Sequence, residues 1–394
     1  MTINRNIGLD YLRSVAIIIV LANHCLFEFF FGTGKAEFAG HVASLSVSAV
    51  IAIEWLFVLS GYLIGTMMIR SFEKPGTWIQ RARDFWLRRW FRTVPNYYLF
   101  VIVNLLLIHY GLSKGAFEYK YLFFSQNLAT VELKPHFFGE SWSLALDEWF
   151  YFVMPVLLGI LGLFLPMGGK KSFILASLAL ILLPMLGRLM HTTPVDFFQW
   201  DDQIRRITIY HLDATGWGVL AAVMNKWYPD WWFAGVKKKL VVGVLCMAAG
   251  LFFVVSLVHT TFMTPFRFSA GNLLSITLMA GGTFLVIPWL TSLSAKGGAL
   301  TWITARLSLY SYSIYLVHYP MLFLMKHWFG IGNATSIEAT WLYVVIWLAL
   351  VFVISGVIFN VFEKPVSDLR DRFTKHVDAS PFSKTALSRP ASKS

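Results

Sequence analysis

Ten apolar runs recur along this 394-residue chain, each long enough to cross a hydrocarbon layer of about 30 Å as a helix. They lie at residues 11–31, 43–69, 90–112, 142–166, 172–190, 207–225, 239–259, 269–291, 307–327 and 338–361. Backbone polar groups cannot be hydrated inside a bilayer, so such runs form helices. The 57% share of hydrophobic residues and the 14% share of charged ones exclude an ordinary soluble domain. The sequence therefore predicts an all-α polytopic membrane helix bundle in contact with the lipid bilayer.

The distribution of Lys and Arg predicts the orientation of this bundle. With the N-terminus in the cytoplasm, the loops on that side and the C-terminal tail hold 21 Lys and Arg, against 8 in the opposite loops. Positive residues are enriched on the cytoplasmic side, so both termini are predicted to be cytoplasmic. The formal net charge of +12 then reflects topology and does not indicate a nucleic-acid partner. We expect a transmembrane domain over residues 1–365, whose first run is retained rather than cleaved, and a mobile cytoplasmic tail over 366–394.

Two ionisable residues in the first run, Arg13 and His24, indicate chemistry inside the membrane. Ionisable side chains are costly there and usually functional. Eleven residues of helix bring the second side chain to within roughly 20° of the first, about 16 Å further along the axis. A neutral imidazole can accept the proton of a hydroxyl, so His24 is a candidate general base. The alternative is a hydrogen-bonded packing residue.

Six short motifs resemble those of the acyltransferase-3 family of membrane acyltransferases, in which an Arg and a His separated by ten residues mark the first helix. They are Gly8 to Arg13 with His24, Glu54 to Ile64, Arg89-Trp90-Phe91-Arg92 with Pro95, Ser141 to Leu144 with Glu148 and Tyr151, Ser311 to Leu316 with His318, and Glu363-Lys364-Pro365. The motifs follow the family's order over roughly 360 residues. Two departures are Leu56 in place of the family's common Phe and Lys364 in place of its usual Arg.

This resemblance implies a multi-pass O-acyltransferase of a bacterial inner membrane. Its co-substrate would be acyl-CoA, with acetyl-CoA favoured, and its acceptor a hydroxyl of an extracytoplasmic or lipid-linked glycan. Family members modify lipopolysaccharide, exopolysaccharide, peptidoglycan, signalling oligosaccharides and macrolides, so the acceptor stays open. Some relatives carry a fused esterase-like domain, and we expect none here. The chain has no paired Cys or His-Glu-x-x-His spacing, and no metal is expected.

A basic cluster, Arg88, Arg89 and Arg92, is predicted to close the first cytoplasmic loop and open the third helix. Arg89 and Arg92 are three residues apart and would project from one helix face. Their planar guanidinium groups suit the phosphates of coenzyme A, and the resemblance favours this role. Arg13 is assigned to the same donor. The alternatives are contacts with anionic lipid head groups for the cluster and a snorkelling anchor for Arg13.

Three of the carboxylates inside the predicted spans are candidates for the site or its surroundings. Glu148 and Asp213 lie at about the depth of His24, and a base benefits from a carboxylate that orients it. Glu148 is the preferred partner, although a neighbouring Ser, Trp or Tyr could satisfy it instead. Glu54 is predicted to pair with Arg13 or to stay protonated.

Five further residues are candidates for the pocket: Ser141, Trp142, Tyr151, Tyr315 and His318. Trp142, together with the loop 113–141, could present an aromatic acceptor surface or simply anchor the chain at the interface. A transporter or flippase for a carbohydrate or lipid is the main alternative function, and a non-catalytic scaffold is a second. The chain has no internal repeat, which counts against the many transporters built from duplicated halves.

Overall fold

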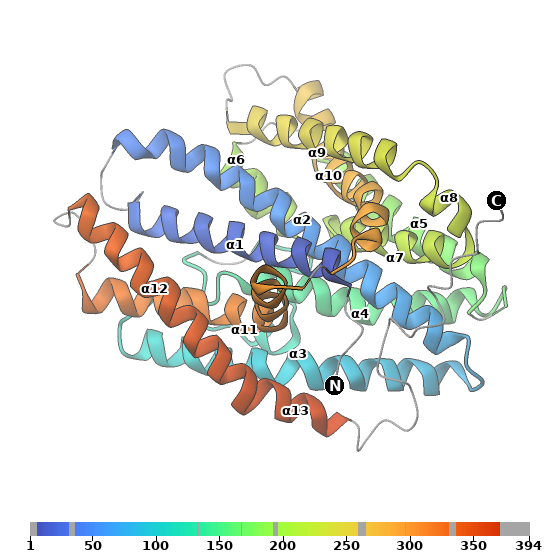
Figure 1. Cartoon of the computed structure of the whole chain (residues 1–394), viewed down its shortest axis with the longest axis horizontal. Helices are drawn as coiled ribbons and strands as arrows, with labels where there is room; N and C mark the ends of the chain where they lie inside the picture. The colour runs from blue at the N-terminus through green and yellow to red at the C-terminus, as the bar shows by residue number, and fades with distance from the viewer. Residues whose placement is uncertain are drawn as a thin grey trace.

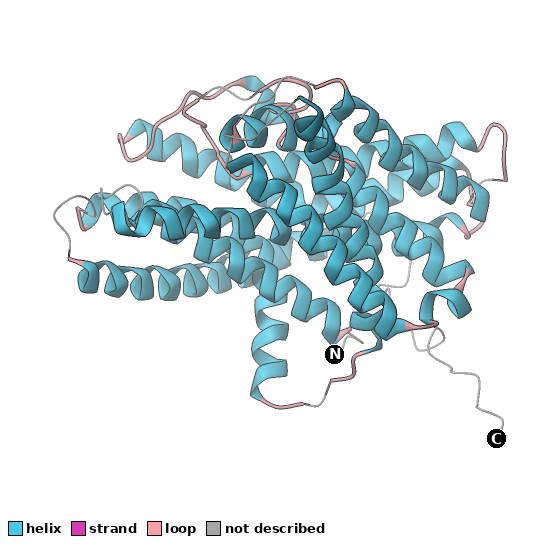
Figure 2. Cartoon of the chain, turned by 90° about the horizontal axis from the view of Figure 1, so that it is seen from above, coloured by secondary structure: helices cyan, strands magenta, loops and turns pink. Residues whose placement is uncertain are grey.

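The computed structural model describes residues 6–30, 36–131, 134–166, 168–191, 196–258, 265–295, 297–330 and 336–370. Helices are the only regular elements among these residues (Figure 2). The predicted all-α class is therefore confirmed. Most of the predicted tail, residues 371–394, lies outside the described ranges.

Eight helices in the described part of the chain are long and apolar enough to cross a membrane. They are α1 (Ile7–Phe30), α2 (Ala36–Phe72), α3 (Trp78–His109), α4 (Ser141–Leu161), α5 (Lys170–Leu189), α9 (Val236–Val258), α10 (Pro265–Ser292) and α12 (Ile337–Ile358). The last continues through a π-helical turn into α13 (Lys364–Leu369). These helices match eight of the ten predicted runs, and the polytopic membrane fold is confirmed.

The other two predicted runs correspond to helices of a different kind. The run 207–225 becomes a short 3-10 turn followed by α7 (Asp213–Trp227), whose 15 residues extend only about 22 Å. The run 307–327 lies within α11 (Ala299–Trp328), which is 30 residues long but rich in Ser, Tyr and His. Neither helix belongs to the long and apolar set. The count of ten spans thus exceeds the eight that meet this standard, because apolar residues also line the interior of the bundle. Short helices α6 (Phe197–Trp200) and α8 (Pro229–Phe233) flank α7 along the chain.

The helices that carry the candidate site pack around α1. That helix lies against α2 and α11, and α2 lies along α7, while α9 and α10 pair at one edge of the bundle (Figure 1). The contact between α2 and α7 depends on Gly61 and Gly218. A Cβ atom at Gly61 would lie 2.1 Å from the carbonyl oxygen of Thr215, and one at Gly218 would lie 2.2 Å from that of Val58. Small residues let the two backbones approach closely, as is common between membrane helices.

Candidate active site

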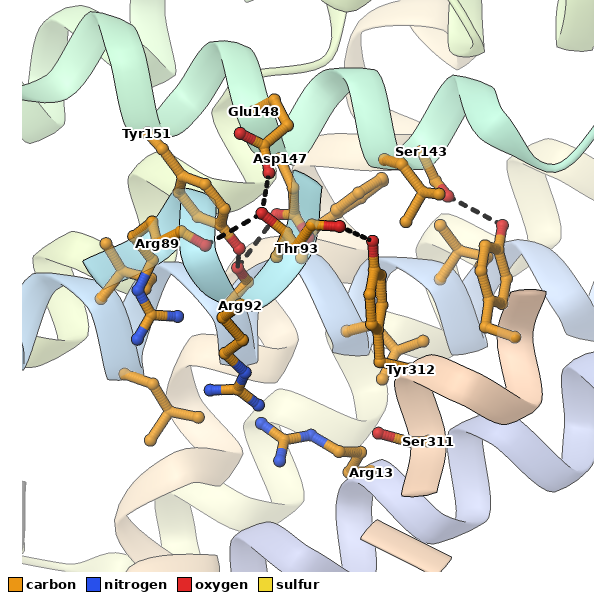
Figure 3. A pocket seen from close by; sticks show the side chains of 18 of the residues that line it. Arg13, Arg89, Arg92, Thr93, Ser143, Asp147, Glu148, Tyr151, Ser311 and Tyr312 are labelled. Atoms are coloured by element: carbon orange, nitrogen blue, oxygen red, sulfur yellow. Dashed lines mark hydrogen bonds between the residues drawn. The ribbon is translucent and has the colours of Figure 1, made fainter. Parts of the chain in front are cut away.

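A cavity of about 240 Å³ lies between α1, α2, α3, α4 and α11. Arg13, Arg89 and Arg92 line it, and we call it the arginine cavity. Figure 3 shows the guanidinium groups of Arg13 and Arg92 extending into the same space from different helices. The structure thus brings together three of the four arginines that were predicted to bind the donor. Arg88, the fourth, is not among the residues lining the cavity.

The arginines of α3 lie deeper than the sequence predicted. Helix α3 begins at Trp78, not at residue 90, because Thr77 and Gln80 form a capping box there. Arg89 therefore lies three turns into the helix and is only 8% exposed. Its Nη2 lies 3.1 Å from the sulfur of Met67, and its guanidinium carbon lies 5.9 Å from the centre of the Tyr151 ring. Packing against soft and aromatic groups positions a cation without neutralising it.

Two adjacent carboxylates face the same cavity from α4. Glu148 accepts a hydrogen bond of 2.5 Å from the hydroxyl of Thr93, whose backbone carbonyl accepts one from Tyr312 (Figure 3). Asp147 accepts one of 2.9 Å from Ser60, which in turn lies 3.3 Å from the hydroxyl of Tyr151. Glu148 is therefore satisfied within the arginine cavity. The predicted pairing of Glu148 with His24 is corrected: a hydroxyl neighbour holds this carboxylate, and His24 has a different partner.

His24 lines a second cavity of about 570 Å³, which we call the histidine cavity. Trp142, His136 and Glu140 also line it, so the loop 113–141 contributes to its wall as well as to the surface. The arginine and histidine cavities share two lining residues, Ile53 and Tyr315. The Tyr315 hydroxyl is fixed at this common wall, 2.7 Å from the hydroxyl of Ser143 and 3.1 Å from the carbonyl oxygen of Glu140.

The partner of His24 is His318 on α11. Nδ1 of His24 lies 2.9 Å from Nε2 of His318, and the planes of the two rings are parallel to within 10°. Nδ1 of His318 lies 2.5 Å from the carbonyl oxygen of Tyr315 and must donate to it. In its neutral form His318 then accepts at Nε2. His24 consequently donates from Nδ1 and keeps the lone pair of its Nε2 for a substrate.

Glu54 and Asp213 have structural partners. Oε1 of Glu54 lies 2.8 Å from Nε2 of His211, and neither side chain is exposed. Asp213 accepts two hydrogen bonds, of 3.0 and 2.6 Å, from the fully buried guanidinium of Arg188. The expectation that Glu54 pairs with Arg13, and the grouping of Asp213 with His24, are therefore wrong. Buried carboxyl groups need hydrogen-bond partners, and residues of neighbouring elements, His211 and Arg188, supply them here.

The remaining predicted pocket residues divide between the cavities and the core. Tyr151 lines the arginine cavity, and Trp142 lines the histidine cavity. Ser141 is fully buried and accepts a hydrogen bond of 3.0 Å from Gln126, so its role is structural. His318 is also fully buried, behind His24. Within the described ranges, no group of three or more His, Cys, Asp or Glu side chains could hold a metal ion.

The loop between α6 and α7 contributes charges that the sequence interpretation treated only as topology signals. Nε of Arg205 and Nε of Arg206 donate to the two oxygens of Asp201, at 2.5 and 2.7 Å. Burial alone would raise the pKa of Asp201, but the charges and hydrogen bonds of these two arginines hold that pKa below its ordinary value. Burial alone would lower the pKa of Arg206, but the negative charges of Asp201 and Asp202 have the larger effect. The pKa of Arg206 is therefore raised. Asp201 and Arg206 are therefore ionised at neutral pH. Arg205 and Arg206 both line the histidine cavity.

The structure is a multi-pass membrane fold with two adjoining cavities lined by the predicted site residues. Residues 6–360 match the model of the acyltransferase domain, and the chain belongs to the acyltransferase-3 family. The chain therefore carries the family's acyltransferase domain, which favours an acyltransferase over the transporter and scaffold alternatives.

Two curated relatives resemble most of the chain. The peptidoglycan O-acetyltransferase OatA of Listeria monocytogenes is 25% identical over 381 residues, which cover 91% of this chain and 55% of that protein. YrhL of Bacillus subtilis, a candidate peptidoglycan O-acetyltransferase, is 24% identical over 379 residues, which cover 91% of this chain and 54% of its own length. The chain thus spans about half the length of these relatives. No solved structure shows a significant match to it.

Proposed function

We propose that the protein transfers an acetyl group from cytoplasmic acetyl-CoA to a hydroxyl of a glycan on the outer side of a bacterial inner membrane. The observation that carries this proposal is the pair of cavities that meet at Ile53 and Tyr315. One cavity presents three arginines to an anionic donor, and the other presents an imidazole to an acceptor. The O-acetyltransferase relatives support the same reaction, and peptidoglycan, on which OatA acts, is a glycan of the expected class.

The donor would enter the arginine cavity from the cytoplasmic side. Arg89 and Arg92 would bind its nucleotide phosphates, and Arg13 would contact the diphosphate or the pantetheine arm. Arg13 and His24 are separated by about 16 Å along α1, which is of the order of the length of that arm. The thioester would therefore reach the wall at Tyr315 while the phosphates stay with the arginines.

The acceptor would occupy the histidine cavity with one hydroxyl at Nε2 of His24. His24 removes the proton of this hydroxyl as its oxygen attacks the thioester carbonyl carbon. The tetrahedral intermediate then collapses, the carbon–sulfur bond breaks, and the coenzyme A thiolate takes the proton from the imidazolium. The hydrogen bond to His318 keeps Nδ1 protonated throughout, so that Nε2 alone exchanges the proton. The products are an O-acetyl ester and free coenzyme A.

Replacement of Arg89 by Lys tests the donor site. The variant keeps the positive charge but loses the planar fork, so the KM for acetyl-CoA is expected to rise about 10-fold or more while kcat changes little. The assay measures acetyl transfer at varied acetyl-CoA with the protein in proteoliposomes. Arg83→Lys is the matched control, because Arg83 lies on the same helix with a side chain 66% exposed. An unchanged KM in Arg89→Lys would instead indicate an anchor for lipid head groups.

A further inference from the structure

The histidine cavity contains a second recognition element besides His24. Arg205 and Arg206 line it side by side, and Asp201 binds each of them through its Nε atom. When Nε of a guanidinium donates to a carboxylate oxygen, at least one of its two terminal nitrogens points away from that carboxylate. The two arginines thus share the carboxylate of Asp201, with Asp202 3.9 Å from Nε of Arg206, and retain terminal N–H groups for another partner.

One of these terminal nitrogens is buried and unsatisfied. Arg205 is 6% exposed, and its Nη1 has no hydrogen-bond partner among the described residues. A buried cationic N–H group without an acceptor is costly, so such a group in a cavity wall indicates a missing oxygen ligand. The neighbouring acid, Asp202, lies with Lys134 and His136 and 3.9 Å from Nε of Arg206, and no hydrogen bond joins it to Nη1 of Arg205.

Trp142 fixes the orientation of the arginine pair. The guanidinium carbons of Arg205 and Arg206 lie 4.7 and 5.7 Å from the centre of the Trp142 ring, a cation–π arrangement. The same indole also stacks on the ring of His211, which Glu54 and the backbone carbonyl of Arg205 hold. The pair is therefore preorganised, which lowers the entropic cost of binding a ligand.

We propose that the histidine cavity binds its acceptor through an acidic group, a carboxylate or a phosphate, held by Arg205 and Arg206. Guanidinium groups bind both anions through paired, charge-assisted hydrogen bonds. Two acids, Glu28 and Glu140, also line this cavity, and Glu28 is already paired with Lys326 at 2.6 Å. This inference rests on the proposed function in one respect: the anchored acid would place a nearby sugar hydroxyl at His24.

A binding measurement without any acetyl donor tests the inference. Two pairs of radiolabelled probes are offered to the purified full chain. The first pair is the N-acetylglucosamine–N-acetylmuramic acid disaccharide and its lactyl carboxamide, and the second is N-acetylglucosamine 1-phosphate and N-acetylglucosamine. Wild type is expected to bind the acidic member of one pair at least about 10-fold more tightly than the neutral member. The pair that shows the preference identifies the acid as a carboxylate or a phosphate.

Arg206 is the residue to change, because Arg205 still pairs with Asp201 in its absence. Arg206→Gln is expected to abolish most of the preference, because it weakens binding of the acidic probe and leaves binding of the neutral probe unchanged. Arg206→Lys is expected to keep an intermediate preference. Lys114→Gln removes one positive charge from the same cavity and is expected to change the preference less than about twofold. Equal binding of both members in both pairs by wild type, or an unchanged preference in Arg206→Gln, would overturn the inference. A preserved preference in a protein that transfers no acetyl group would refute the proposed reaction but leave the anion site standing.

Discussion

Replacing His24 by Ala is expected to reduce the rate of acetyl transfer about 10²- to 10⁴-fold, the range typical for loss of a general base. The side chain is the imidazole at the wall of the histidine cavity, and its Nε2 can accept a proton. Because Arg13, Arg89 and Arg92 are untouched, the KM for acetyl-CoA should change little. Initial rates in proteoliposomes at saturating acetyl-CoA measure the effect. Near-normal transfer by a folded His24→Ala protein would remove His24 from the reaction.

Two substitutions at His318 separate the positioning of His24 from simple packing. His318→Gln keeps an oxygen that can accept the hydrogen bond from Nδ1 and is expected to retain most of the rate. His318→Met has a similar volume but a poor acceptor, and a fall of about 10-fold is expected. The KM for acetyl-CoA should stay constant in both variants. Equal rates in the two would show that this side chain only fills space.

Replacing Asp213 by Asn is expected to destabilise the protein by about 3–5 kcal/mol, because it leaves the Arg188 guanidinium charged and without its carboxylate in the core. Both side chains are fully buried and are joined by two hydrogen bonds. Thermal unfolding in detergent measures the loss. Asp368→Asn is the control: this carboxylate is 59% exposed and lies 3.8 Å from Lys364, so its loss should have almost no effect.

The same pair distinguishes a structural Asp213 from a catalytic one. The double variant Arg188→Met with Asp213→Leu removes both charges and is expected to recover most of the lost stability. Its transfer rate per folded molecule should match wild type. A stable Asp213→Asn protein with strongly reduced transfer would reverse this assignment.

Much of the fold follows from apolar run length alone, because a bilayer permits only helices in such runs. Eight spans were located in this way. Two predicted runs fall outside the long and apolar set, because α7 has only 15 residues and α11 carries polar side chains of the site. Run length also placed the start of α3 twelve residues late, since polar residues around Arg81 continue the helix beyond its apolar part.

The site was predictable where one helix determines the geometry. Arg13 with His24, and Arg89 with Arg92, each follow from spacing along a single helix, and the structure places each of them at a cavity wall. The partnerships between helices were not predictable, because depth in the membrane does not reveal which helices are neighbours. Asp147 could have been noticed, since it adjoins Glu148 in the same motif. The role of Arg205 and Arg206 could not have been predicted, because their contacts with Asp201 and Trp142 form only in the folded loop.

The central claim is that the donor and the acceptor reach one reaction site from opposite sides of the membrane. The direct test uses sealed vesicles with the protein inserted in one orientation, a glycan acceptor trapped inside, and acetyl-labelled acetyl-CoA supplied outside, on the side of the chain termini. We predict ester-linked label on the trapped glycan, one coenzyme A released outside for each ester formed, and neither product with His24→Ala. Transfer only when donor and acceptor share one side, or label on the glycan that does not depend on His24, would contradict the account.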